Sequence, residues 1–171
     1  SLSPDTAAKI HAVGNGIDTD YFTPENDYPQ PYAAGGPVLI FTGAMDYWPN
    51  IDAVTWFAAE IFPAIRNAIE GARFYIVGSN PSGEVEKLAQ QDGIFVTGRV
   101  PDMRPYLHHA QVAVTPMRIA RGAQNKVLEA MAMGKPTVTT PTALAGIDAK
   151  PDRDILVADG IVWNAPTTSG K

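Results

Sequence analysis

The sequence predicts a doubly wound, Rossmann-like α/β domain, and two features of its pattern carry that prediction. Short apolar runs such as 38–42 (VLIFT) and 72–77 (ARFYIV) stand between glycines or prolines, as is typical of parallel strands that are buried on both faces. Segments with helical periodicity alternate with these runs, which favours a parallel sheet with helices on both faces and right-handed crossovers. The 171 residues suffice for one such domain with a substantial core. Further strands are expected at 94–97, 111–115, 137–139 and 155–157.

The helices expected between these strands differ in length. A long helix starts at Asn50, the predicted N-cap, and Pro63 is expected to kink or split it. A polar helix is expected over 84–91 and a short one over 101–109. The predicted inward positions are Val54, Phe57, Ala58, Ile61, Ile65 and Ile69 in the first helix and Val85, Leu88 and Ala89 in the second.

Four loops should meet at one edge of the predicted sheet. They are 43–49, 98–101, 116–124 and 140–146, and each follows the carboxyl end of a strand. Ligands of open α/β sheets bind outside these ends. The sequence therefore predicts one cleft built from separate parts of the chain.

The segment 121–136 (RGAQNKVLEAMAMGKP) reads as a turn, a short helix and a stop. Gly122 allows a tight approach to the helix start, Gly134 ends the helix, and Pro136 prevents its continuation. The expected apolar face consists of Val127, Leu128 and Met131, and the expected second face of Lys126, Glu129 and Met133.

The start of this helix suits a phosphorylated sugar ligand. Unpaired N–H groups and partial positive charge at a helix N-terminus favour a phosphate. Glu129, one turn further in, can accept two hydrogen bonds from neighbouring sugar hydroxyls. The alternative is that Lys126 and Glu129 form a solvated i,i+3 pair on a surface helix, worth only about 0.2–0.5 kcal/mol.

Composition excludes several classes of function. The net charge of −5 and the lack of a long basic run argue against a nucleic-acid partner. There is no cysteine for disulfides or thiolate chemistry, and the three histidines show no metal-ligand spacing. No apolar run approaches the roughly 20 residues that span a bilayer, and no signal peptide opens the chain, so a cytoplasmic protein is expected.

Several segments resemble one family. The run LEAMAMGKPTV resembles the signature of the GT-B retaining glycosyltransferases of family 4, or group 1. VGNGIDTDYFTP is similar to the segment that follows the interdomain linker in that family. FTGAMDYWPNIDAVTWF, VTGRVPDMRPYL and RGAQNKVLEAMAMG are closest to bacterial sugar transferases of exopolysaccharide and exosortase systems. The resemblance extends from about residue 13 to about residue 159.

The resemblance implies the donor-binding half of a two-domain enzyme. Residues 1–36 would be a segment and loop from the interdomain linker, 37–160 the nucleotide-sugar-binding domain, and 161–171 an irregular tail unlike the helices with which the family continues. The implied reaction is retaining transfer of a sugar from a nucleotide diphosphate sugar, without cofactor or metal. The implied partners are the donor and an N-terminal acceptor domain missing from this chain, with peripheral membrane contact through the full-length enzyme.

The resemblance also implies roles for residues in the loops. Gly43 would pass close to the diphosphate, because a Cβ would keep the backbone away. Asp46, Trp48 and Asn50 would shape the cleft, although Trp48 could equally be a core residue. The segment whose backbone contacts the base in relatives corresponds here to Gly98, Arg99 and Val100.

The remaining implied contacts belong to the segment before and within the 121–136 helix. Arg118, Arg121 and Lys126 concentrate positive charge, Gly122 opens the turn, and Gln124 and Asn125 would contact sugar or phosphates. Glu129 would hold the ribose hydroxyls. Arg121 stands where the family usually has a glutamate, and no arginine or lysine lies between Gly43 and Glu60. The family commonly has an arginine and a lysine in that stretch, so we expect Arg121 and Lys126 to supply the positive charge instead. Glu129, Lys126 and Arg121 would then be the catalytic group.

Other interpretations remain open. A dehydrogenase of the same fold class needs G-x-G-x-x-G after the first strand, which GAMDYWP does not provide. A phospho-receiver needs acidic residues at the end of that strand, and VLIFTG has none. A degenerate, non-catalytic domain and a sugar-nucleotide epimerase-like relative stay as alternatives.

Overall fold

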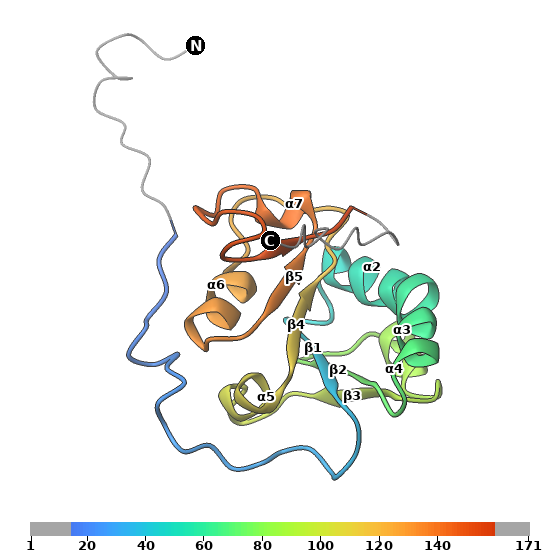
Figure 1. Ribbon diagram of the computed structural model, residues 1–171. Coiled ribbons are helices and arrows are strands. Elements are labelled where there is room, and N and C mark those ends of the chain that lie inside the picture. The colour runs from blue at the N-terminus through green and yellow to red at the C-terminus, as the bar shows by residue number, and fades with distance from the viewer. Residues whose placement is uncertain (1–14, 160–171) are drawn as a thin grey trace, which may run out of the picture.

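The computed structural model describes residues 15–159, which form a single parallel sheet between two layers of helices (Figure 1). The strand order is β3-β2-β1-β4-β5-β6, and all adjacent strands are parallel. This confirms the predicted doubly wound, Rossmann-like α/β fold. The strands are β1 (Val38–Thr42), β2 (Arg73–Val77), β3 (Ile94–Gly98), β4 (Val112–Thr115), β5 (Thr137–Thr139) and β6 (Leu156–Val157).

The direction of strand addition reverses between β1 and β4, which are neighbours in the sheet although two strands separate them in the chain. From β1 the chain adds β2 and β3 on one side, and from β4 it adds β5 and β6 on the other. A crevice forms outside the carboxyl ends of the strands at such a switch point. The helices that flank the sheet are α2 (Trp48–Trp56), α3 (Phe62–Ala68), α4 (Gly83–Leu88), α5 (Arg104–His109), α6 (Asn125–Ala132) and α7 (Pro141–Leu144).

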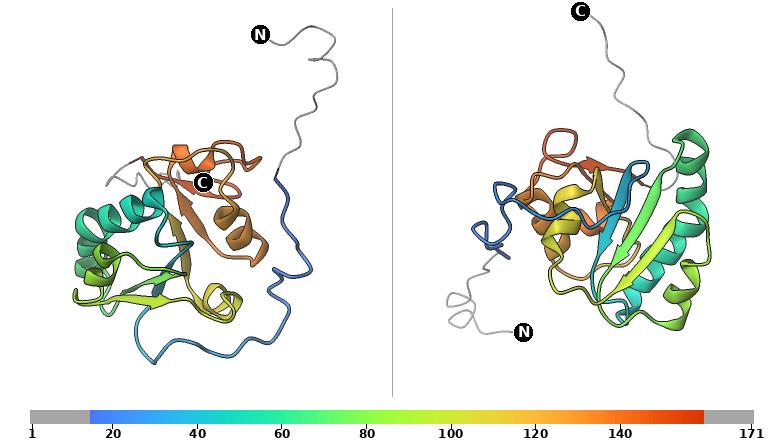
Figure 2. Two further views of the ribbon diagram at one scale, coloured as in Figure 1. Left: turned by 180° about the vertical axis from the view of Figure 1, so that it is seen from behind. Right: turned by 90° about the horizontal axis from the view of Figure 1, so that it is seen from below.

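Figure 2 shows helices on both faces of the sheet, and a hydrophobic cluster of buried side chains holds each layer to it. On one face, Phe57 and Phe62 pack on Phe74 of β2, with ring centroids 4.7 and 5.7 Å from that of Phe74. On the other face, Leu107 of α5 and Met133 after α6 are buried against the sheet. No helix within residues 15–159 is long and apolar enough to cross a membrane.

The segment 15–36 runs along the face that carries α5 and α6 (Figure 2). It forms neither helix nor strand, but it buries Phe22, Tyr28 and Tyr32. The Tyr32 hydroxyl donates to the Tyr106 carbonyl at 2.6 Å, and a His109 ring nitrogen lies 2.7 Å from the Tyr28 carbonyl oxygen. Aromatic burial, rather than secondary structure, holds this segment to the domain. The expected tail, 161–171, and the start of the chain to residue 14 lie outside the described residues.

The first long helix differs from its prediction in how it begins. It starts at Trp48 rather than at an Asn50 cap, with Pro49 in the first turn and no side-chain cap on Tyr47. Proline is favoured there because the first N–H groups of a helix have no partner to lose. Asn50 is buried at 4% exposure inside the first turn, so its side chain serves the cleft instead of the helix end.

Near Pro63 the helical run is not interrupted: a π-helical stretch, Phe57–Ile61, joins α2 directly to α3. A proline removes an i→i−4 hydrogen bond, and wider i→i+5 bonding accommodates that loss. Two predicted inward positions are wrong. Ile69 is 46% exposed because the backbone has left the helix there, and Ala89 is exposed because α4 ends at Leu88.

The apolar face of α6 was also assigned incorrectly. Val127, Ala130 and Met133 are buried, whereas Leu128 and Met131 are only partly so. An i, i+3, i+6 row therefore faces the sheet. This rotation leaves Lys126 and Glu129 at the edge of the buried row, directed toward the carboxyl ends of the strands.

Candidate functional site

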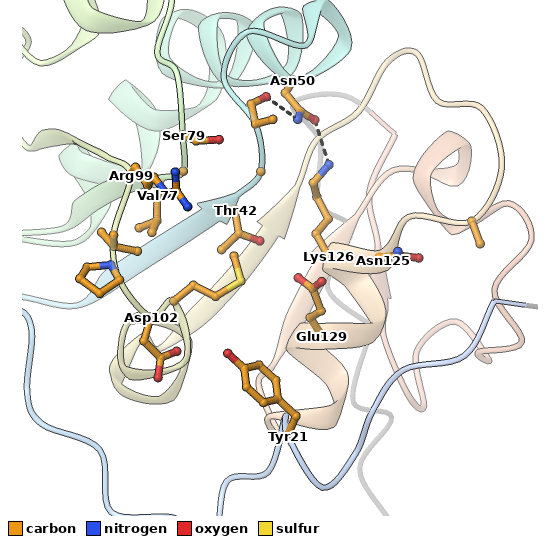
Figure 3. A pocket seen from close by; sticks show the side chains of 17 residues that line it. Tyr21, Thr42, Asn50, Val77, Ser79, Arg99, Asp102, Asn125, Lys126 and Glu129 are labelled. Carbon is orange, nitrogen blue, oxygen red and sulfur yellow. Dashed lines mark hydrogen bonds between the residues drawn. The ribbon is translucent and has the colours of Figure 1, made fainter.

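A cleft of about 590 Å³ opens at the carboxyl ends of β1 and β2, beside the start of α6 (Figure 3). Its size lies within the range of small-molecule sites. The loop after β3 and the segment 15–36 close its other side. The lining residues are Tyr21, Thr42, Gly43, Ala44, Asn50, Val77, Gly78, Ser79, Arg99, Val100, Pro101, Asp102, Met103, Ala123, Asn125, Lys126 and Glu129.

Two glycines bring the loops after β1 and β2 into close contact at the floor of the cleft. The Gly43 N–H donates to the Val77 carbonyl at 3.1 Å, and the Met45 N–H donates to the Ser79 carbonyl at 2.8 Å. A Cβ on Gly78 would lie 1.6 Å from the Gly43 carbonyl oxygen, and a Cβ on Gly43 would lie 2.7 Å from Asn50 Nδ2. Both positions therefore exclude any side chain, and the backbone itself faces the ligand space.

Asn50 and Lys126 form a bridge across the top of the cleft. Asn50 Nδ2 donates to the Ala44 carbonyl at 2.8 Å, and its Oδ1 accepts from Lys126 Nζ at 2.8 Å (Figure 3). The Lys126 ammonium also lies 5.0 Å from the centroid of the Phe41 ring. A buried asparagine thus orients the amine of α6 toward the loop after β1, from which the predicted Gly43 contact comes.

The charges of Lys126 and Glu129 are perturbed by their surroundings. Burial lowers the pKa of Lys126 to about 8, with the Glu129 carboxylate opposing that shift. Burial raises the pKa of Glu129, with Lys126 opposing that shift. Both side chains are partly buried and line the cleft, so the alternative of a solvated surface pair is wrong. Perturbed groups in a cleft are typical of functional sites.

The opposite end of the cleft is built from the loop after β3 and from Tyr21. Asp102 accepts from the Arg104 guanidinium with both oxygens, at 2.7 to 3.0 Å. This charge-assisted fork lowers the pKa of Asp102. The Arg104 guanidinium also covers the Tyr21 ring, 3.9 Å from its centroid. Val100, Pro101 and Met103 make the remainder of this wall apolar.

Seven of the predicted site residues line the cleft, Asn50 among them, and seven do not. The structure brings together Gly43, Asn50, Arg99, Val100, Asn125, Lys126 and Glu129. Gly98 ends β3 next to Arg99 with φ +66°, and Gly122 has φ +68° with no atom near its missing Cβ. Gly122 is thus required for its backbone conformation rather than for a tight approach. Gln124 occupies the N-cap position of α6, but its side chain makes no capping hydrogen bond. Its amide donates instead to the Gly122 carbonyl at 3.2 Å.

The predicted charge cluster is dispersed by the fold. Arg118 pairs with Asp52 of α2 and lies over Trp56, at 5.3 Å from the ring centroid. Both Arg118 and Trp56 line a separate cavity of about 270 Å³. Arg121 is exposed and makes no hydrogen bond or ion pair with any residue from 15 to 159. Lys126 and Arg99 are the cationic side chains that line the cleft.

Of the three residues expected to shape the cleft, Asn50 lines it, whereas Asp46 and Trp48 do not. Asp46 is exposed and accepts from Asn80 Nδ2 at 3.0 Å. Trp48 is 57% exposed, so it is not a core residue. Within the described chain, no cluster of three acidic or histidine side chains is arranged to hold a metal ion.

Sequence reasoning missed several lining residues. Thr42, Gly78 and Ser79 follow from a signal that the sequence does carry, because Thr42 ends β1 and the other two come directly after β2. Asp102 and Met103 extend the predicted loop by two residues. Tyr21 has no local signal, because it reaches the cleft only through the path of the segment 15–36.

Comparison with known proteins places this fold in one family. A family model described as Glycosyl transferases group 1 matches residues 36–163. No curated protein sequence matches the chain.

Solved structures show the same fold. A glycosyltransferase from Rickettsia africae is 18% identical with a TM-score of 0.63, over 78% of this chain and 39% of that one. HepE of Anabaena, solved with UDP and glucose, is 14% identical with a TM-score of 0.63, over 85% of this chain and 42% of that one. The C-terminal domain of LpcC from Francisella tularensis, a glycosyl transferase group 1 family protein, is 15% identical with a TM-score of 0.51. The match covers 85% of this chain and 80% of that one.

The chain spans about two fifths of the first two structures and most of the third. The parallel sheet, the cleft at the switch point and the family match over residues 36–163 all indicate the same family. The chain belongs to the Glycosyl transferases group 1 family.

Proposed function

We propose that this chain is the donor-binding domain of a retaining glycosyltransferase and that the cleft holds a nucleoside diphosphate sugar. The observation that carries the proposal is the Asn50–Lys126 bridge, which directs a partly buried amine at the backbone of Gly43. Glu129 lies one turn further along α6 on the same side of the cleft (Figure 3). A cation, a side-chain-free loop and a carboxylate in this order suit the diphosphate and ribose of one ligand.

The diphosphate is assigned to the Lys126 end. Its negative charge would compensate the desolvation that lowers the pKa of Lys126, and the ammonium would donate to phosphate oxygens. The Glu129 carboxylate would accept hydrogen bonds from two ribose hydroxyls, which compensates its own burial. Asn125, at the first position of α6, lies beside the diphosphate end.

The proposed reaction transfers the sugar from the diphosphate to an acceptor hydroxyl with retention of configuration. A bond forms between the acceptor oxygen and the anomeric carbon, the bond from that carbon to the diphosphate oxygen breaks, and the acceptor proton leaves to the diphosphate or to solvent. Negative charge grows on the leaving diphosphate, so Lys126 contributes more in the transition state than in the ground state. Arg121, exposed outside the cleft, receives no role in the isolated domain.

The full enzyme requires more than this chain. The chain spans about two fifths of the Rickettsia and Anabaena structures, so we assign the acceptor site to an N-terminal domain outside it. We place the reaction on the cytoplasmic side, in polysaccharide or glycoconjugate synthesis, with membrane contact made by the whole enzyme. The similarity of several segments to exopolysaccharide-associated transferases supports this pathway. Alone, the chain is expected to bind the donor nucleotide and to turn over little or none.

The test is calorimetric titration of the 171-residue chain with UDP, GDP and ADP. One nucleotide is expected to bind, and Glu129→Gln to weaken it by about tenfold, or 1.4 kcal/mol, through lost charge-assisted hydrogen bonds. Glu86→Gln is the matched control, because Glu86 is exposed on α4 away from the cleft. No binding at millimolar nucleotide would contradict donor binding by this domain. Binding that is equal in Glu129→Gln and wild type would place the nucleotide elsewhere.

A further inference from the structure

The two ends of the cleft differ in chemistry, and Tyr21 lies at the end away from Lys126. Figure 3 shows Lys126, Glu129 and Tyr21 one after another along the cleft, with the Tyr21 hydroxyl directed toward the space between Glu129 and Asp102. The Lys126 end offers an ammonium and amide groups. The Tyr21 end offers a phenol and the apolar wall of Val100 and Met103.

Tyr21 is held in this position by its neighbours. The Tyr21 N–H donates to Asp18 Oδ1 at 2.9 Å, which fixes the turn that presents the ring. Phe22 packs edge-on at 5.0 Å between centroids and is itself buried in the core. Arg104 lies 3.9 Å over the ring and is fixed in turn by Asp102. One face of the ring is therefore covered, and no residue from 15 to 159 forms a hydrogen bond with the hydroxyl.

Asp102 and Arg104 are occupied by each other, which decides what this end of the cleft can bind. Both Asp102 oxygens accept from Arg104, and the Arg104 guanidinium is stacked on Tyr21. The pair is neutral as a unit, so Arg99 is the cationic side chain that the loop after β3 contributes to the lining. A phenol beside an apolar wall instead suits an uncharged, planar group that carries hydrogen-bonding edges.

We propose that Tyr21 is a binding contact for the nucleoside part of the donor, made by the segment 15–36 rather than by the sheet. This inference rests on the proposed function, because the ligand's orientation follows from the diphosphate at Lys126 and the ribose at Glu129. The base then continues toward Val100, Met103 and the Tyr21 hydroxyl. Arg104 is a positioning residue that acts through the Tyr21 ring. The segment leading into the domain thereby becomes part of its nucleotide site.

The experiment separates contacts to the nucleoside from contacts to the phosphates. The affinity of the nucleotide that binds wild type and that of inorganic pyrophosphate, measured by competition, are compared across variants. Tyr21→Ala should weaken the nucleotide about tenfold or more and leave pyrophosphate within about twofold. Tyr21→Phe should lose less, because it removes only the hydroxyl contact. Lys126→Met should weaken both ligands, because both carry the diphosphate.

The control is Tyr47→Ala, because Tyr47 is 49% exposed, close to the 46% of Tyr21, but does not line the cleft. It should change neither affinity. Arg104→Lys, which loses the planar fork, should reproduce part of the Tyr21→Ala effect on the nucleotide alone. Equal loss of nucleotide and pyrophosphate in Tyr21→Ala, or no loss of either, would overturn the role of Tyr21 while leaving the proposed function intact. Failure of the wild type to bind any nucleotide would instead overturn the proposed function, and this role with it.

Discussion

The partly buried amine of Lys126 should make nucleotide binding depend on pH in a range where few other side chains titrate. In the free protein, burial lowers the pKa of Lys126 to about 8. A bound diphosphate places negative charge beside the amine and raises that pKa, so the complex holds the proton to higher pH. Affinity is therefore full below pH 8 and falls as the pH rises through 8, because binding must then take up a proton.

The size of the effect follows from a folded-state pKa of about 8. If the complex stays protonated to pH 9, the dissociation constant rises about tenfold between pH 7 and pH 9, which corresponds to 1.4 kcal/mol. At pH 8 about half a proton should be taken up for each nucleotide bound. Calorimetry in two buffers with different ionisation enthalpies measures this uptake directly.

Two variants identify the titrating group. Lys126→Met should bind the nucleotide weakly at every pH. Its affinity should show no step near pH 8, because the variant has no amine to lose a proton. Glu129→Gln should bind more weakly but keep the step, which distinguishes Lys126 from the other perturbed group in the cleft. The terminal phosphate, with a second pKa of about 6, is ionised throughout this range. A dissociation constant that is equal at pH 7 and pH 9, without proton uptake, would refute the assignment of Lys126 to the diphosphate.

Two further predictions concern the groups that hold this amine and the loop beside it. Asn50→Leu removes the acceptor that favours the charged form of Lys126, so the step in affinity should move below pH 8 in the same titration, and an unchanged midpoint would contradict the bridge. Gly78→Ala should lower the free energy of unfolding by about 1–3 kcal/mol in urea and weaken nucleotide binding, because its methyl group collides with the Gly43 carbonyl. Gly83→Ala, at a glycine with open space around it, is the matched control and should leave both unchanged.

The sequence determined the sheet and the location of the cleft, because both follow from local periodicity. Continuous apolar runs identify buried strands, and the helices between them require parallel pairing. All six predicted strands form, with ends that differ by at most one residue from their expected positions. The glycine that ends a strand and the short helix that contains Glu129 are likewise local signals. The position of the cleft and the Glu129 helix follow from these signals, whereas the roles expected of Gly43 and Lys126 were implied by the resemblance to the family.

Which charged side chains reach the cleft was decided only by the tertiary structure. Arg118 and Arg121 stand within eight residues of Lys126 in the chain, yet Arg118 pairs with Asp52 across the fold and Arg121 points to solvent. A long flexible side chain finds its partner through packing between elements, which sequence spacing does not encode. The rotation of α6, which buries Met133 instead of Leu128 and Met131, is set by contact with the sheet.

Tyr21 shows the same division between local and tertiary information. Its turn is encoded locally, since Asp18 accepts from the backbone that follows it. Its place in the cleft depends on the burial of Phe22, Tyr28 and Tyr32 against α5, α6 and the sheet, and on Arg104 more than eighty residues away. Local hydrogen bonds and periodicity therefore determined the elements and the edge at which the cleft forms. Long-range packing and ion pairing decided which residues face a ligand there, because those free energies depend on contacts between segments that are distant in the chain.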